Sequence, residues 1–98
     1  MIVPALYLDY NSIDMFYVYV IKSKRTEELY YGFSSDLKAR IQSHNHGNNI
    51  ATKSSVPWEL IYYEAFKSTK DTHKRELQLK KYGNARTHLK NRIQDSLL

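Results

Sequence analysis

Two pairs of tyrosines are the groups in this sequence that are best suited to act on a charged ligand. Tyr17 and Tyr19 lie two positions apart, and Tyr30 and Tyr31 are adjacent and are followed at once by Gly32. A phenol can take part in proton transfer, so such a set could support acid–base chemistry. Tyrosine is also a good strand residue, and cross-strand aromatic pairing alone would account for both pairs. The tyrosines by themselves leave both interpretations open.

Three further side chains could act with the tyrosines on an anion. Arg40 and His44 are four positions apart, so on a helix they would share one face. An arginine there is most simply a surface residue, and a histidine near a helix end is favoured by the helix dipole. Glu76 is one of only two acids in the basic stretch 67–92, which fits a metal ligand, but it can also pair with Lys80.

Positive charge is concentrated in the C-terminal part of the chain. The net charge is +5, and residues 67–92 hold nine Lys or Arg against two acids, whereas residues 1–66 hold six basic and seven acidic groups. Such asymmetry favours a polyanion as partner, because each neutralised phosphate releases condensed counterions. A solvated helix face kept basic for solubility explains the same pattern equally well.

The composition indicates one folded soluble domain. The chain has 98 residues, of which 42% are hydrophobic and 26% charged. There is no cysteine, so disulfides, a disulfide-linked partner and thiolate metal sites are excluded, and a reducing compartment fits. No stretch has the length of a membrane span, and the opening "MIVPALYL" is a poor signal peptide. We therefore expect a cytoplasmic protein that does not bind membranes.

Three segments predict β-strands. Residues 16–22 and 28–33 are rich in aromatic and β-branched side chains and are separated by the short polar "SKRTE", which predicts an antiparallel hairpin. Residues 58–66, "WELIYYEAF", predict a third strand. Alternation along the first strand divides its side chains between two faces, with one face formed by Tyr17, Tyr19 and Ile21 and the other by Phe16, Val18 and Val20.

A first helix is predicted within residues 34–47, "SSDLKARIQSHNHG". Ser34 or Ser35 is expected to cap its free amides, and Gly47 is expected to end it. Its buried stripe would consist of two apolar residues four positions apart, Leu37 and Ile41. The next segment, residues 48–55, is predicted to be a polar loop that could contain a short turn of helix.

Two further helices follow the third strand. Residues 68–83 have Ser68 or Thr69 as a cap and Gly83 after the end, which predicts a helix of about three turns. Residues 84–98 predict a last, basic helix with an apolar stripe at four-residue spacing, formed by Leu89, Ile93 and Leu97.

The order of the elements predicts an α/β (α+β) fold with a small three-stranded antiparallel sheet flanked by helices. Residues 15–98 would form the single domain. Residues 1–14 fit this plan poorly and are interpreted as an N-terminal extension, because Met15 directly precedes the first strong strand.

The motifs "YVY" at 17–19, "YYG" at 30–32 and "DLKARIQSHNHG" at 36–47 resemble those of the GIY-YIG nuclease family. The likeness is closest to its short single-domain bacterial members, which are related to the N-terminal nuclease domain of excinuclease C. It continues through "PWELIYYEAF" and "KRELQLKK" and covers about residues 15–92. The chain departs from the family at Phe33, where many relatives have a lysine, a threonine or a similar residue.

The resemblance implies five catalytic residues. Tyr19 matches the last tyrosine of the first motif, and Tyr30 the first tyrosine of the second. Arg40 matches the helix arginine, and His44 a histidine found one turn further in several branches of the family. Glu76 matches the glutamate that holds one divalent metal ion, Mg²⁺ or Mn²⁺. Tyr19 would need cationic neighbours or a partner to lower its pKa before it could act as a base, whereas neutral His44 has a suitable pKa, so the base is left open between them.

The activity implied is metal-dependent endonucleolytic cleavage of DNA, directed by the structure of branched, nicked or single-stranded DNA rather than by its sequence. The backbone of the DNA would be held by basic residues of the last two predicted helices, namely Lys74, Arg75, Lys81, Arg86, Lys90 and Arg92. Two alternatives use the same fold without catalysis. One is a nucleic-acid-binding module, and the other is an accessory protein that binds a partner nuclease through exposed aromatic side chains.

Overall fold

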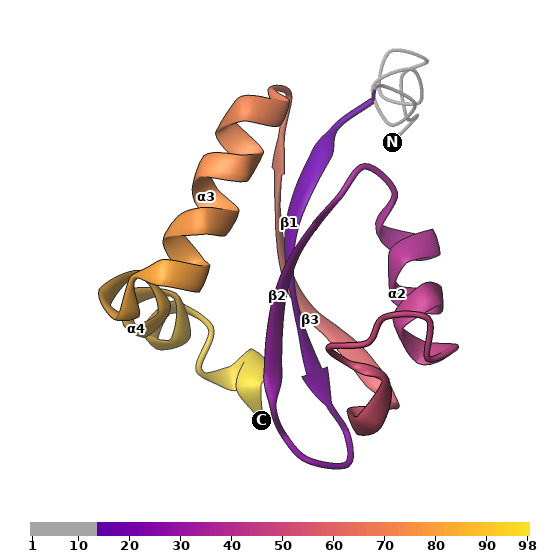
Figure 1. Cartoon of the computed structure of the whole chain (residues 1–98). Coiled ribbons are helices and arrows are strands. Elements are labelled where there is room, and N and C mark those ends of the chain that lie inside the picture. Colours follow the sequence, from indigo (N-terminus) through magenta and orange to yellow (C-terminus); the bar gives the residue numbers. More distant parts are fainter. Residues whose placement is uncertain (1–13) are drawn as a thin grey trace, which may run out of the picture.

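Figure 1 presents the computed structural model, which describes residues 14–98. The predicted extension, residues 1–14, lies outside the described residues except for Asp14. From there the chain runs in the predicted order of strand, strand, helix, strand, helix, helix, with two short 3-10 helices added. The predicted α/β (α+β) fold class is confirmed.

The three strands form one antiparallel sheet. β1 (Phe16–Ser23), β2 (Leu29–Ser34) and β3 (Trp58–Phe66) lie in the order β2-β1-β3. Each strand begins and ends within one residue of its predicted bounds. β1 is therefore the central strand and β2 an edge strand, so side chains that cross β2 reach the rim of the sheet.

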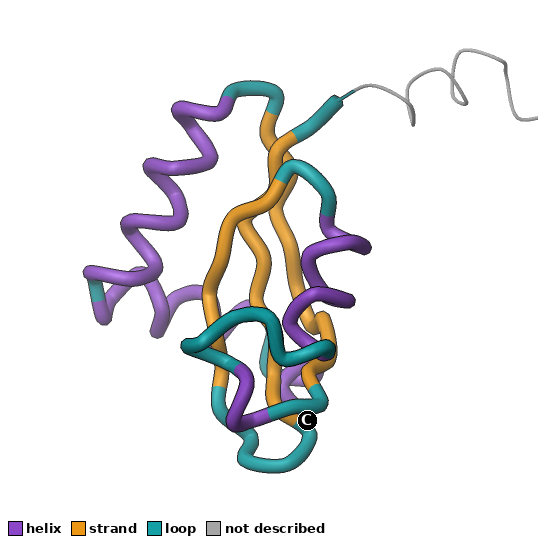
Figure 2. The backbone as a smooth tube through the Cα atoms, turned by 45° about the vertical axis from the view of Figure 1, so that its right-hand side comes forward, coloured by secondary structure: helices purple, strands orange, loops and turns teal. Residues whose placement is uncertain are grey.

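The helices cover both faces of this sheet. α2 (Leu37–Asn45) lies on one face, while α3 (Thr69–Lys81) and α4 (Gly83–Arg92) lie on the other, as Figures 1 and 2 show. The 3-10 helix η1 (Lys53–Ser55) precedes β3, and η2 (Asp95–Leu97) follows α4. The result is three layers, with the sheet in the middle.

Each face of β1 supplies one half of the core, as the predicted alternation requires. Val18 and Val20 are fully buried in a cluster with residues of α3, α4 and the segment after it, namely Leu79, Leu89 and Ile93. Tyr19 and Ile21 are fully buried on the opposite face with Trp58, where Leu37 and Ile41 of α2 pack against them. Burying a large apolar side chain contributes about 1.5–3 kcal/mol, so both clusters hold helices to the sheet.

The predicted cap of the first helix is wrong. Neither Ser34 nor Ser35 caps α2; the Asp36 side chain accepts a hydrogen bond from the Ala39 amide at 3.1 Å. Ser34 instead uses its hydroxyl on the backbone of Asp36, at 2.9 Å from the amide nitrogen. A carboxylate is as good an N-cap as a hydroxyl, so the helix can begin two residues later than Ser34 without losing a cap. Gly47 follows the helix with a positive φ of 76°, as predicted for its end.

The predicted last helix is too long. α4 ends at Arg92, and Ile93 leaves the helical conformation with φ −116° and ψ 32°. Ile93 is buried in the core, and the turn that follows brings Leu97 of η2 against the same cluster. The apolar spacing correctly identified the buried residues, but packing against the end of the β1–β2 hairpin outweighs continuation of the helix.

Candidate functional site

The position of the Tyr19 side chain depends on a glycine. Tyr19 of β1 lies opposite Gly32 of β2 in the antiparallel register. A Cβ atom at Gly32 would lie only 2.3 Å from both Cζ and the hydroxyl oxygen of Tyr19. The tyrosine ring therefore crosses directly over the glycine backbone, a close approach that strand glycines permit. In this way a residue of the central strand carries its hydroxyl to the edge of the sheet.

Two residues of α2 meet the Tyr19 hydroxyl. His44 Nε2 lies 2.7 Å from the hydroxyl oxygen, and Arg40 Nε donates to the same oxygen at 3.3 Å. The shared helix face predicted for Arg40 and His44 is confirmed, because both side chains reach one atom. His44 is 1% exposed, so it is not the solvated helix-end histidine of the simpler interpretation.

A threonine that the sequence did not single out defines the tautomer of His44. His44 Nδ1 lies 2.7 Å from the hydroxyl oxygen of Thr52, which donates its own proton toward the Asn49 carbonyl at 3.4 Å. Thr52 then accepts from Nδ1–H, which leaves Nε2 as the acceptor of the Tyr19 O–H. Trp58 holds the loop in place, since its Nε1–H donates to the Thr52 carbonyl at 2.9 Å. Nothing in the local pattern of the loop, residues 48–55, marks Thr52 for this position.

Burial keeps both members of the Tyr19–His44 pair neutral. It raises the pKa of the Tyr19 phenol by more than the hydrogen bond and charge of Arg40 lower it. The lowered pKa that Tyr19 would need in order to act as a base on its own is therefore not present, because Tyr19 has no exposed surface. Burial, followed by the charge of Arg40, lowers the pKa of His44 from its usual 6.5. A neutral phenol beside a neutral imidazole can pass a proton without forming a free phenolate first.

The depressed pKa of His44 predicts a dependence of stability on pH. Between the usual value of 6.5 and the lower folded pKa, the unfolded chain binds a proton at His44 that the folded chain does not. The free energy of unfolding should therefore fall as pH decreases through this window, by at most about 1.4 kcal/mol per pH unit. Urea unfolding at about pH 7.5 and about pH 5.5 would measure it.

Two variants make that measurement specific. His44→Gln should flatten the pH dependence in this window, whereas His88→Gln, at an exposed histidine of α4, should leave it unchanged. An equal pH dependence in wild type and His44→Gln would contradict the assignment.

Glu76 reaches the same edge of the sheet from α3, which lies on the face opposite to α2. Its carboxylate, on α3, is 19% exposed and lies 3.3 Å from the Lys80 ammonium and 3.8 Å from His73 Nδ1. The Lys80 ammonium also lies 5.6 Å from the ring centroid of Tyr30, and the Tyr30 ring lies 5.2 Å from that of His44. These contacts join α3 to α2 across β2.

The charge of Glu76 raises the pKa values of both Tyr19 and Arg40. For Tyr19, burial is the main cause of the raised pKa, and the Glu76 carboxylate raises it further. For Arg40, the hydrogen bond to Tyr19 is the main cause of its raised pKa, and the charge of Glu76 again adds to it. The five side chains predicted as a site thus converge on one rim of the sheet, with Tyr19 and His44 buried and the other three partly exposed.

The comparisons with known proteins agree with this arrangement. The GIY-YIG catalytic domain matches residues 15–94. The chain belongs to the GIY-YIG family. A UPF0213 protein of Clostridium perfringens is 38% identical over 68% of this chain and 72% of its own length. UPF0213 proteins of Staphylococcus saprophyticus and Staphylococcus haemolyticus are 35% and 37% identical, over 71% and 67% of this chain and 85% and 80% of theirs. No solved structure matches the chain.

Membership of the GIY-YIG family indicates a nuclease domain that binds nucleic acid, and GIY-YIG nucleases are generally dependent on a divalent metal ion. The names of the UPF0213 relatives state no substrate. None of the helices described here is long and apolar enough to cross a membrane.

The donor set at this GIY-YIG site is compatible with one hard divalent cation. Within residues 14–98 no group of three or more His, Cys, Asp or Glu side chains is close enough to enclose a metal ion. Mg²⁺ does not need such a group, because it keeps several waters and is commonly bound by one or two carboxylates together with substrate phosphates. Glu76 offers one partly exposed carboxylate that already holds a cation, the Lys80 ammonium. Its chemistry fits this kind of ion.

Phe33, where the GIY-YIG motif departs from many relatives, forms an apolar wall beside the site. Its ring stacks on His73 with centroids 4.2 Å apart and an interplanar angle of 23°. His73 is the same residue that faces Glu76. The position therefore contributes a stacked pair rather than a polar group.

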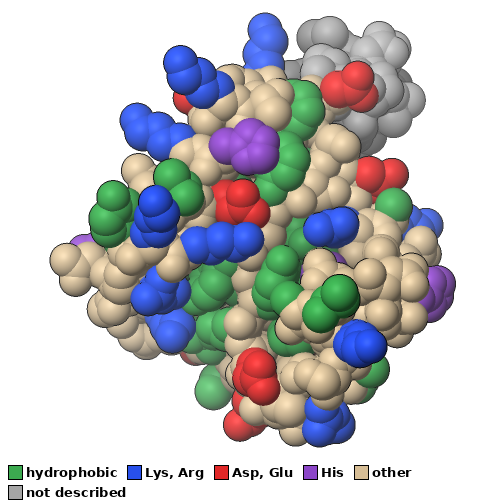
Figure 3. All heavy atoms as spheres, viewed as in Figure 1, with side chains coloured by type: hydrophobic (Ala, Val, Ile, Leu, Met, Phe, Trp, Pro, Cys, Tyr) green, Lys and Arg blue, Asp and Glu red, His purple; other side chains and the backbone are tan. Residues whose placement is uncertain are grey.

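The six basic residues predicted to hold DNA fall into two groups. Arg75 is engaged with Glu64 at 2.9 Å, and Arg86 donates to the Leu79 and Lys80 carbonyls at 2.8 and 3.0 Å. The other four are exposed, namely Lys74, Lys81, Lys90 and Arg92. Figure 3 shows Lys and Arg side chains gathered along α3 and over α4 on the face that Figure 1 presents. DNA contact by these residues stays a prediction.

Proposed function

We propose that this protein is a metal-dependent endonuclease that hydrolyses DNA phosphodiester bonds by direct attack of water. The observation that carries the proposal is the meeting of three side chains at one hydroxyl oxygen, that of Tyr19, with the Glu76 carboxylate in electrostatic range. A phosphodiester needs a proton acceptor for the water, a cation for the phosphate and a counter-charge for the leaving oxygen. The site contains a candidate for each.

Arg40 is proposed to hold the scissile phosphate. Its Nε is used by Tyr19, and the side chain is partly exposed, so its remaining N–H groups can form a fork on two phosphate oxygens. These donors would stabilise the additional negative charge of the transition state. Because guanidinium stays protonated at all relevant pH values, this role does not depend on a proton equilibrium.

Tyr19 and His44 are proposed to act together as the proton acceptor. The Tyr19 hydroxyl would take the proton of the attacking water while passing its own to His44 Nε2, and Thr52 would hold the imidazole in the tautomer that leaves Nε2 free. In the unbound protein Tyr19 has no exposed surface. A phosphate that attracts Arg40 would lengthen its 3.3 Å contact with the phenol and open the oxygen to water. Catalytic hydrogen bonds commonly tighten only when substrate is bound.

Two partly exposed groups complete the site. Tyr30, which lies between Lys80 and His44, offers a second phenol on the accessible side and is proposed to orient the phosphate or the water. Glu76 would hold a single Mg²⁺ or Mn²⁺, which when bound would neutralise charge on the departing 3′ oxygen. Before the ion binds, the Lys80 ammonium lies 3.3 Å from the carboxylate and holds it in place.

The substrate is proposed to be DNA recognised by its shape. The exposed basic residues of α3 and α4 can contact sugar–phosphate groups, which positions a nucleic acid without reading its bases. Branched, nicked or single-stranded DNA is therefore favoured over a particular sequence.

Purified protein should cut such DNA in Mg²⁺ or Mn²⁺ and not in EDTA, and Tyr19→Phe should slow cutting by about 10²- to 10⁴-fold because proton transfer is lost. Labelled branched, single-stranded and duplex DNA would be incubated with each protein and the rates compared. Binding measured in EDTA should change little in Tyr19→Phe, since the phenol is buried. Tyr63→Phe is the matched control, because Tyr63 is a 52% exposed strand tyrosine of β3.

Two other results would contradict the proposal and would each support one of the two non-catalytic alternatives. Salt-sensitive binding of DNA by the wild type without metal-dependent cutting would support a non-catalytic binding module. Absence of salt-sensitive binding would support an accessory protein.

A further inference from the structure

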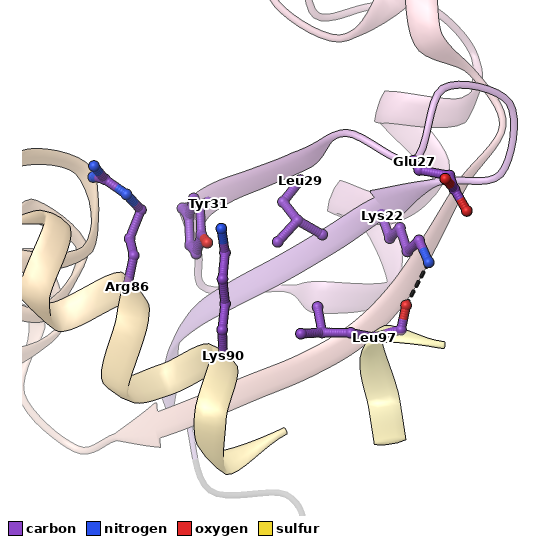
Figure 4. A pocket seen from close by; sticks show the side chains of 7 residues that line it. All are labelled: Lys22, Glu27, Leu29, Tyr31, Arg86, Lys90 and Leu97. Atoms are coloured by element: carbon purple, nitrogen blue, oxygen red, sulfur yellow. Dashed lines mark hydrogen bonds between the residues drawn. The ribbon is translucent and has the colours of Figure 1, made fainter. Parts of the chain in front are cut away.

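A hollow of about 630 Å³ lies on the opposite face of the sheet from Tyr19 and His44, between β2, the end of β1, α4 and η2. We call it the β2–α4 pocket; Figure 4 shows the seven residues that line it. Its apolar part is formed by Leu29 and Leu97, with the Tyr31 ring beside them. Its polar part has three cations and one acid, namely Lys22, Arg86, Lys90 and Glu27. An apolar floor under a cationic rim suits a ligand that carries both a phosphate and a flat organic group.

Two of the cations are held in place by backbone carbonyls. Arg86 Nη1 donates to the carbonyls of Leu79 and Lys80, which end α3, at 2.8 and 3.0 Å. Lys22 donates through Nζ to the Leu97 carbonyl (Figure 4). These bonds fix both positive charges before any ligand arrives, which lowers the conformational cost of binding an anion.

Lys90 supplies the third, unengaged cation. It is exposed on α4, and within residues 14–98 its ammonium has no ion-pair partner. Figure 4 shows Arg86 and Lys90 rising from α4 toward β2 on either side of Tyr31. A phosphate between their side chains would meet two positive charges, while the acid of the pocket, Glu27, lies at its far end beside Lys22.

The pocket adjoins the candidate catalytic site along the β2 edge. Tyr31 in the pocket follows Tyr30 of the site, and the two side chains project to opposite faces of β2. Lys80 joins the two places, because its ammonium contacts Glu76 and its carbonyl accepts from Arg86. A DNA strand that lies along this edge would pass from one to the other.

We propose that the β2–α4 pocket holds one unpaired nucleotide of the DNA strand that is cut, with its phosphate between Arg86 and Lys90 and its base or sugar against Leu29, Leu97 and Tyr31. This inference rests on the proposed nuclease function and refines its substrate to DNA with a single-stranded nucleotide next to the cleavage site. A paired nucleotide cannot leave its stack to enter the hollow without unpairing. A volume of about 630 Å³ lies in the usual range for small-ligand sites and is more than a bare phosphate requires.

Binding in EDTA tests the proposal without relying on catalysis. Fluorescence anisotropy would follow a labelled single-stranded oligonucleotide and a duplex of the same sequence over a range of salt concentrations. Lys90→Ala should weaken single-strand binding by about 3- to 10-fold and reduce the slope of log K against log salt by about 0.7, the loss of one phosphate contact. Duplex binding by Lys90→Ala should fall by no more than it does in a variant that loses an exposed lysine outside the pocket, since only general backbone attraction is lost there. Lys81→Ala is the charge-matched control: Lys81 is an exposed lysine of α3 that does not line the pocket, so its loss should weaken single-strand and duplex binding alike.

A second variant tests the apolar floor. Leu97→Glu adds a negative charge to the pocket at a half-buried residue of the C-terminal 3-10 helix, and circular dichroism would verify its folding. It should weaken single-strand binding at least as much as Lys90→Ala. Equal losses for single strand and duplex in Lys90→Ala would overturn the proposal in favour of general backbone attraction. Binding of free deoxyadenosine monophosphate as tight as that of the oligonucleotide would overturn it in favour of a free-nucleotide site.

These outcomes are separable from those of the proposed function. The wild type could fail to cut DNA and still prefer single-stranded DNA, while Lys90→Ala loses that preference. This result would contradict the proposed catalytic function and support the pocket. The wild type could cut DNA in a metal-dependent way while Lys90→Ala and Lys81→Ala bind single-stranded DNA equally well. This result would contradict the pocket and support the proposed catalytic function.

Discussion

Glu76→Gln is expected to reduce metal-dependent DNA cleavage by at least about 10³-fold, because a metal ion that stabilises transition-state charge contributes several kcal/mol and each 1.36 kcal/mol is tenfold in rate. Glutamine keeps the size of the side chain but has no charge with which to hold a divalent cation. The exchange removes the ion pair with Lys80, a partly exposed contact at 3.3 Å that contributes little to stability. Folding and DNA binding in EDTA should therefore be almost unchanged.

Glu64→Gln is the matched control for this experiment. Glu64 is 21% exposed and Glu76 19% exposed, and each is paired with a cation, Arg75 in one case and Lys80 in the other. Glu64 lies on β3 opposite Val18, on the other face of the sheet from the Tyr19 side chain, so its loss should leave the cleavage rate within about twofold of wild type after correction for any change in folded fraction. A Glu76→Gln protein that retains wild-type cleavage in Mg²⁺ would remove the carboxylate from the mechanism.

Gly32→Ala is expected to damage the site and the fold together. The added methyl group would lie 2.3 Å from Cζ and the hydroxyl oxygen of Tyr19, a ring that is fully buried and hydrogen-bonded to His44. Either the ring moves, which breaks the bonds to His44 and Arg40, or the strands separate locally. Overpacking of this kind costs about 1–3 kcal/mol and occasionally more, and cleavage should fall by at least about 10²-fold through loss of the proton acceptor.

A double-mutant cycle isolates the cause. In a Tyr19→Leu background, which shortens the side chain over the glycine, Gly32→Ala should cost much less unfolding free energy than it does in the wild type. Gly83→Ala is the control substitution, because its nearest neighbour would be the Arg86 Nη2 atom at 3.7 Å, an ordinary contact. Denaturant unfolding and the cleavage assay would measure both effects. If Gly32→Ala were as well tolerated as Gly83→Ala, close contact between β2 and Tyr19 would not be what positions the phenol.

The faces of the strand and helix that carry the site residues can be predicted from sequence patterns within single elements. Period-two alternation in β1 correctly separates Tyr19 from Val18 and Val20, because a strand exposes successive side chains to opposite faces. The four-residue spacing of Arg40 and His44 correctly predicts that they share one helix face. These are properties of single elements, and the sequence of one element is enough to read them.

Other parts of the site depend on contacts between distant segments. Thr52 lies in a polar loop, and only the placement of that loop against Trp58 brings it to His44. Arg86 looks like a surface residue of a basic helix, yet it binds the carbonyls at the end of α3 because the turn after Lys81 folds α4 back. The net rise in the Tyr19 pKa likewise comes from burial by other elements, which outweighs the adjacent cation.

The position of β2 at the rim of the sheet has a consequence for self-association. The outer side of an edge strand offers unpaired amides and carbonyls on which another chain can extend the sheet. In this molecule the same strip carries Tyr30 and lies beside Glu76 and Lys80. Any second polypeptide that paired with β2 would cover those groups, so sheet extension at this rim and access of a nucleic acid to it are mutually exclusive. Occupancy of the rim by a polyanion would accordingly protect the protein from edge-to-edge aggregation.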